Sequence, residues 1–158
     1  MDELDRAAQI LDHLRVMLEA ELLQARGQRL LIRALDTQGL FERARQRSVF
    51  NAQLAQLERT LAEALEAAGR AFGLEQVTLI DLRTAAPEAS QRLDVRMTDV
   101  RALASALREI DAVNLKLGGR ALCRVRSYLA ALAPRIVAYD RRGACRPMDD
   151  LSTACRVA

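Results

Sequence analysis

The chain is poor in the side chains that most often build catalytic, metal-binding and base-stacking sites. Its 158 residues include no tryptophan, two tyrosines, three phenylalanines and a single histidine, His13. Because no other metal-binding side chains flank it in a ligand pattern, His13 fits the surface or the edge of a core better than a metal site. The few aromatic rings leave little with which to stack nucleic-acid bases.

Residues that break helices are also scarce. Three prolines and seven glycines argue against an architecture of strands and tight turns. Alanine, leucine, arginine and glutamate dominate instead, a bias typical of long helices and coiled-coil-like packing. The length suits one domain and is too short for two ordinary ones.

Cysteine and long apolar runs are limited as well. Cys123, Cys145 and Cys155 form an odd set without a C-x-x-C motif, which predicts free thiols in a reducing cytoplasm. The acidic, polar start of the chain does not resemble a secretion signal. The longest uncharged run, Ser48 to Leu57, contains Asn and Gln, so no membrane insertion is expected.

What the sequence does contain is apolar residues spaced three and four apart, which predicts long amphipathic helices. We expect helices over residues 3–35 and 37–71, with Asp36 or Thr37 capping the second. A short helical piece precedes Pro87, and a third long helix covers residues 88–133. The predicted fold is therefore all-α, an elongated antiparallel bundle of three main helices over residues 1–140, followed by a mobile basic tail over residues 141–158.

Positive charge gathers toward the C-terminus. Residues 118–158 carry eight basic and three acidic side chains, whereas residues 1–117 carry 16 basic and 18 acidic ones. A basic end can bind nucleic acid, and its footprint would be Arg120, Arg124, Arg126, Arg135, Arg141 and Arg142. The net charge is only +3 and no nucleic-acid motif is present, so we expect no nucleic acid as partner.

No set of residues indicates catalysis. No cysteine has a histidine spaced for nucleophilic attack, and the serines at 48, 90, 105 and 127 lie in plain helical patterns. Glu19 and Glu21 could form an acid–base pair, but on such a charged helix we expect both to face solvent. The sequence therefore predicts no enzyme activity, no metal and no cofactor.

Two adjacent glycines, Gly118 and Gly119, lie inside the third long helix. Each costs a helix interior about 1 kcal/mol relative to alanine, so the pair needs a reason. A phosphate loop would follow a strand and precede Lys and Ser or Thr, which these glycines do not. A hinge, or the close approach of another helix, fits better.

Two further polar positions attract attention. Asn114 falls on the apolar stripe of the same helix, where it could fix the register of packed helices or lie solvated at the edge. Tyr139 follows the long helix, where it could fold back onto the bundle or anchor a partner.

Three segments resemble the flagellar export chaperone FlgN family: residues 31–58, 73–88 and 109–143. The best is "EIDAVNLKLGGRALCRVRSYLAALAPRIVAYDRRG", with an Asn and a Gly on the late helix and a Tyr-Asp and Gly soon after it. Family members often carry two asparagines three apart before the glycine, whereas here Leu117 takes the second place.

The resemblance implies a small cytoplasmic chaperone. Its clients would be hook–filament junction proteins, bound through their C-terminal segments and brought to the flagellar type III export gate. The late helix would carry the client groove, and Tyr139 would contact the gate. We expect the groove to accept an amphipathic helix, with the glycines admitting its backbone, and to be lined by Leu107, Ile110, Asn114, Leu117, Gly118, Ala121, Leu122 and Val125.

Two other classes stay open. The same apolar stripe could serve a structural coiled-coil or adaptor protein that self-associates, in which case a stable large oligomer is expected in dilute solution. A nucleic-acid-binding helical protein would instead show affinity that falls steeply with salt. Weak homo-oligomerisation is compatible with the chaperone interpretation.

Overall fold

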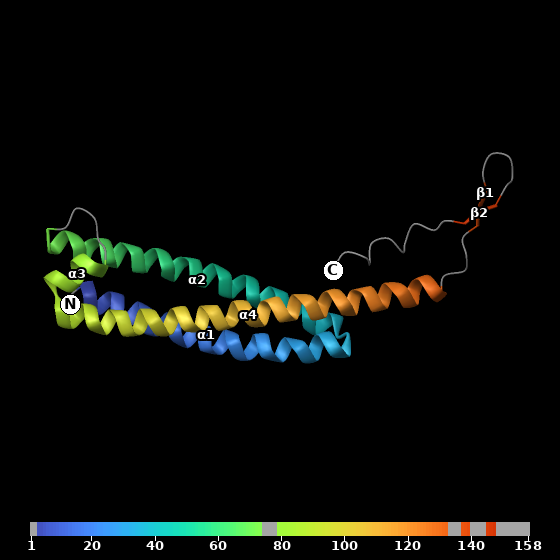
Figure 1. Ribbon diagram of the computed structural model, residues 1–158, viewed down its shortest axis with the longest axis horizontal. Helices are drawn as coiled ribbons and strands as arrows, with labels where there is room; N and C mark the ends of the chain where they lie inside the picture. Colours follow the sequence, from blue (N-terminus) through green and yellow to red (C-terminus); the bar gives the residue numbers. More distant parts are fainter. Residues whose placement is uncertain (1–2, 74–78, 133–136, 140–144, 148–158) are drawn as a thin grey trace.

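The computed structural model describes residues 3–73, 79–132, 137–139 and 145–147, and the chain within these ranges is almost wholly helical. The long helices are α1 (Glu3–Ala34), α2 (Thr37–Ala71) and α4 (Pro87–Leu132), with the short α3 (Leu79–Ala85) between the last two. The chain runs out along α1, back along α2 and out again along α4, so that α1 and α4 are parallel (Figure 1). The predicted all-α class and elongated bundle of three main helices are confirmed.

The turn between α1 and α2 forms where the sequence predicts it. The Asp36 carboxylate accepts a hydrogen bond from the Gly39 backbone N–H at 2.9 Å, which caps α2. A Cβ on Gly39 would come within 2.6 Å of Asp36 Oδ2, so glycine keeps this cap open. Leu35 closes α1 with φ of 53°, in the left-handed region that residues at helix ends often adopt.

The core lies along α1, which packs closely against both α2 and α4 while those two approach each other less closely. One apolar cluster fills the end that holds the N-terminus and includes Leu4, Leu11, Ala64, Leu82 and Leu93. A second cluster, nearer the α1–α2 turn, joins Leu18, Leu22, Ala25, Phe50 and Leu107. Each fully buried leucine contributes about 1.5–3 kcal/mol, so α1 holds the bundle together.

The two parallel helices differ in length. α1 has 32 residues and α4 has 46, so α4 is longer by about 21 Å at a rise of 1.5 Å per residue. The last buried residue of α4 is Asn114, and none of residues 115–132 is buried. We call residues 115–132 the α4 tip; its last turns extend beyond the α1–α2 turn (Figure 1).

Beyond α4 the structure describes two short strands. β1 (Val137–Tyr139) pairs antiparallel with β2 (Cys145–Pro147), and Tyr139 lies opposite Cys145. The β2 strand falls inside the stretch that the sequence predicted to be irregular, where the absence of periodicity gave no sign of it. The rest of the predicted tail, residues 141–144 and 148–158, lies outside the described residues, and its mobility stays a prediction.

The prediction of three free thiols is wrong, because a disulfide takes two of the three cysteines. Cys123, on the α4 tip, is disulfide-bonded, and the side chain of its partner lies outside the described part of the chain. An odd cysteine count without a recognisable spacing could not reveal this bond from the sequence.

Candidate functional site

The structure divides the predicted groove residues into two groups. Leu107 is buried in the second apolar cluster, and Ile110 packs against that cluster. Asn114 is only 4% exposed. These three side chains are used to pack α4 on the bundle, so they do not form an open client surface in this structure.

Asn114 ties α4 to α1 at the end of the core. Its Nδ2 donates to the Ala25 backbone carbonyl at 2.7 Å, and its Oδ1 accepts a bond from Arg29 Nε at 3.3 Å. A buried amide with both ends bonded favours one axial position of α4 over its neighbours. Of the two interpretations left open above, the structure supports the one in which Asn114 fixes the register of packed helices.

The other five predicted residues lie together on the α4 tip. Positions three, four, seven and eleven residues apart share one face of a helix, so this face continues the row by which α4 packs on α1 through Leu107 and Asn114. It comprises Leu117, Gly118, Ala121, Leu122 and Val125, and continues to Tyr128, Leu129 and Leu132. We call these eight residues the tip face. Four of these side chains are more than half exposed: Leu122, Tyr128, Leu129 and Leu132. The tip face therefore has the apolar composition of a helix-packing surface, but none of its residues is buried.

The two glycines of α4 lie in open space. A Cβ built on Gly118 or on Gly119 would meet no atom within 4 Å. Packing among the described residues therefore requires neither glycine. Gly118 belongs to the tip face, whereas Gly119 is one residue further round the helix and lies about 100° away.

A buried ionic network joins the three long helices close to the tip. Glu21 of α1 accepts hydrogen bonds from Arg43 and, at 2.6 Å, from Arg47, both on α2. Arg47 also bonds Asp111 of α4 at 2.6 Å, and its guanidinium lies 5.3 Å from the centre of the Phe50 ring. Because Glu21 is only 5% exposed, the expectation that it faces solvent is wrong.

The sequence contained a signal for this network. Glu21 comes three residues after Leu18 and four before Ala25, so it belongs to the buried stripe of α1. A charged residue at such a position is rare unless it is paired. The partners, on two other helices, could not be found from spacing alone.

A cleft of about 450 Å³ adjoins the network and is lined by residues of α1, α2 and α4. It is lined by Gln28, Leu40, Arg43, Ala44, Arg47, Ser48, Asn51 and Asp111. Asp111 is followed on the same side of α4 by Leu115, Gly118 and Leu122, four, seven and eleven residues later. The cleft and the tip face therefore form one continuous track along α4.

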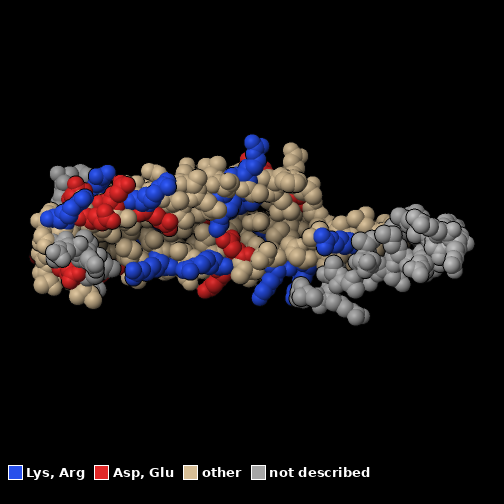
Figure 2. Space-filling view, turned by 90° about the horizontal axis from the view of Figure 1, so that it is seen from above, with Lys and Arg blue, Asp and Glu red and all other residues tan. Residues whose placement is uncertain are grey.

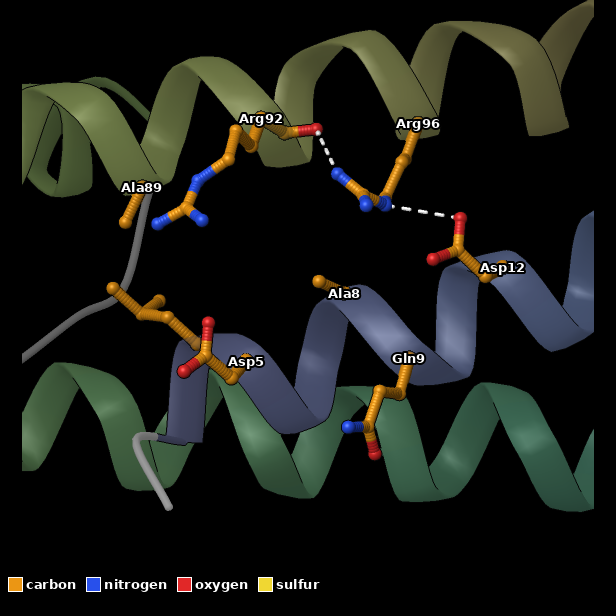
Figure 3. A pocket seen from close by; sticks show the side chains of 8 residues that line it. Asp5, Ala8, Gln9, Asp12, Ala89, Arg92 and Arg96 are labelled. Atoms are coloured by element: carbon orange, nitrogen blue, oxygen red, sulfur yellow. Dashed lines mark hydrogen bonds and ion pairs between the residues drawn. The ribbon is translucent and has the colours of Figure 1, made fainter.

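A second cavity, of about 240 Å³, lies at the opposite end of the bundle between α1 and α4 (Figure 3). Arg96 Nε donates to Asp12 Oδ1 at 2.9 Å, and its Nη1 donates to the Arg92 backbone carbonyl. Asp5 and Arg92 face the same space from the two helices (Figure 3). These residues tie the parallel helices together, and we assign them no ligand.

Over the described residues, no group of three or more His, Cys, Asp or Glu side chains is placed to hold a metal ion. No helix in that part of the chain is long and apolar enough to cross a membrane. The site that stands out is thus the track formed by the cleft and the tip face.

Over the described residues, the protein is an all-helical bundle whose packing row continues onto a face of α4 where no residue is buried. The family comparison is more specific: a family model described as FlgN protein matches residues 1–147. The chain belongs to the FlgN family, whose members are flagellar export chaperones that bind export substrates and act in the cytoplasm. No curated protein and no solved structure matched the chain.

Proposed function

We propose that this protein is a cytoplasmic export chaperone that binds the C-terminal segment of hook–filament junction proteins and delivers these proteins to the flagellar type III export gate. The observation that carries the proposal is the tip face, which continues the packing row of α4 where no residue of the described chain buries it. A client helix laid on this face would extend the bundle by one helix.

The geometry suits a helical client. The tip spans 18 residues, or about 27 Å of helix axis, which is five turns of a partner. Its large apolar side chains stand next to a glycine, so a client backbone could approach α4 closely at that level. The cleft over Arg43 and Arg47 would receive polar side chains from one end of the client.

Replacing Leu122 by glutamine should weaken client binding by about 10- to 150-fold, because a leucine buried in an interface contributes about 1.5–3 kcal/mol. Val95→Gln is the matched control, since Val95 is an exposed apolar residue on α4 far from the tip. Titration calorimetry with the C-terminal segment of the same organism's junction protein measures both. A negative heat-capacity change is expected, as burial of apolar surface requires.

An equal affinity for the two variants would show that the tip face is not the client site. The alternative is that the tip face mediates self-association, which light scattering in dilute solution tests. If the protein forms a stable oligomer and Leu122→Gln converts it to a monomer, the protein is a self-associating adaptor and the chaperone proposal is wrong.

We assign contact with the export gate to Tyr139, at the end of β1. Tyr139→Ala should leave client affinity unchanged while it lowers secretion of the client by cells. Tyr128→Ala is the control with the opposite expectation, because Tyr128 lies on the tip face and its loss should weaken client binding. Client binding lost in Tyr139→Ala would contradict this division of roles.

A further inference from the structure

The tip face has a basic border along one side. Lys116, Arg120 and Arg124 follow one another at intervals of four, so they form a row next to Leu117, Ala121 and Val125. Arg126 lies on the other side of the helix. No acidic residue occurs in residues 112–132, and blue side chains mark the part of α4 that borders the grey residues in Figure 2.

These cations differ from the three arginines that connect the long helices to one another. Arg43, Arg47 and Arg96 form ion pairs with Glu21, Asp111 or Asp12. The structure gives Lys116, Arg120 and Arg124 no ion pair with any described residue, and all three are exposed. Positive charge therefore accumulates beside the apolar face of α4 on which none of the described residues is buried.

We propose that the helix which binds the tip face is acidic along one edge, with carboxylates spaced to meet Lys116, Arg120 and Arg124. This inference rests on the proposed function and adds the charge of its client. The row of cations selects the rotation of the client helix about its axis, because only one edge can lie beside the row. Opposite charge across an interface selects partners and speeds their encounter more than it adds affinity.

The test uses two designed helical peptides with the same leucine stripe. One carries glutamate along a single edge, and the other carries glutamine at those positions. At low salt the full chain should bind the glutamate peptide about tenfold more tightly than the glutamine peptide, since a few exposed ion pairs supply about 0.2–1 kcal/mol each. Raising the salt should remove most of this preference, because exposed charges are screened.

The variant that carries the test is Arg120→Glu/Arg124→Glu, which should abolish the preference for the acidic peptide. Arg45→Glu/Arg101→Glu changes the net charge equally at exposed positions of α2 and α4 that have no ion pair among the described residues. This control should keep the preference. Far-ultraviolet circular dichroism establishes that both variants are folded.

Other outcomes separate the possible failures. If both peptides bind equally and the Leu122→Gln variant binds neither, the client site stands and the acidic edge is wrong. If neither peptide nor the junction segment binds, the proposed function fails as well. Basic amphipathic helices also bind anionic membranes, so binding to phosphatidylglycerol vesicles that depends on Arg120 and Arg124, without a preference between the peptides, would assign the row to a lipid surface instead.

Discussion

Glu21→Ala is expected to lower the free energy of unfolding by about 3–5 kcal/mol, the usual cost of removing one partner from a buried ion pair. The loss would leave the Arg43 guanidinium buried without its carboxylate, while Arg47 would keep only Asp111. Arg43 is as buried as Glu21, and its Nε already has no hydrogen-bond partner among the described residues. Little water could therefore compensate the charge. Urea denaturation followed by circular dichroism at 222 nm measures the change.

Glu19→Ala provides the matched control on the same helix. Glu19 pairs with Arg15 one turn away, and both side chains are about half exposed, so its removal should cost no more than about 0.5 kcal/mol. Near-equal destabilisation by the two variants would mean that Glu21 acts as a surface residue. Glu21→Met/Arg43→Met removes both charges, and apolar residues often replace a buried pair without loss of stability. If Glu21→Ala lowers the free energy of unfolding strongly and the double variant does not, the unpaired charge of Arg43 is the cause.

The network also shows which parts of this fold could be predicted from sequence. The helix bounds followed from local signals: apolar spacing for α1 and α4, the Asp36 cap for α2, and Pro87 for the start of α4. Each of these signals acts within a few residues of the position it determines. The pairing of Glu21 with Arg43 and Arg47 depends instead on how three helices rotate about their axes, which local patterns do not specify.

The candidate site was predicted in part for the same reason. One apolar stripe runs from Leu93 to Leu132 without a change in spacing, so the sequence alone treats it as one surface. In the structure the last residue of this stripe that is buried is Asn114, which binds the Ala25 carbonyl. The division between core and tip face depends on the axial register of two parallel helices, so the sequence could not separate Leu107, Ile110 and Asn114, which pack within the bundle, from the other five predicted residues.

Gly118→Leu is expected to weaken client binding by about 5- to 150-fold, the equivalent of the 1–3 kcal/mol that overpacking a close contact costs. The same change should stabilise the free protein by up to about 1 kcal/mol, because leucine has a higher helix propensity than glycine. The Cβ of the new side chain has room, since a Cβ at Gly118 meets no atom of the described chain within 4 Å. Affinity and stability should thus change in opposite directions.

Gly119→Leu separates close approach from the alternative role of a hinge. Gly119 has the same open surroundings and the same helical backbone, but it lies off the tip face. If the client backbone approaches α4 at Gly118, Gly119→Leu should gain the same stability and keep its affinity. If the glycines serve to bend α4, both substitutions stiffen the helix and should weaken binding alike. Calorimetric titration of the two variants with one junction segment, beside their urea denaturation curves, decides between a helix that is shaped for its client and one that must flex to receive it.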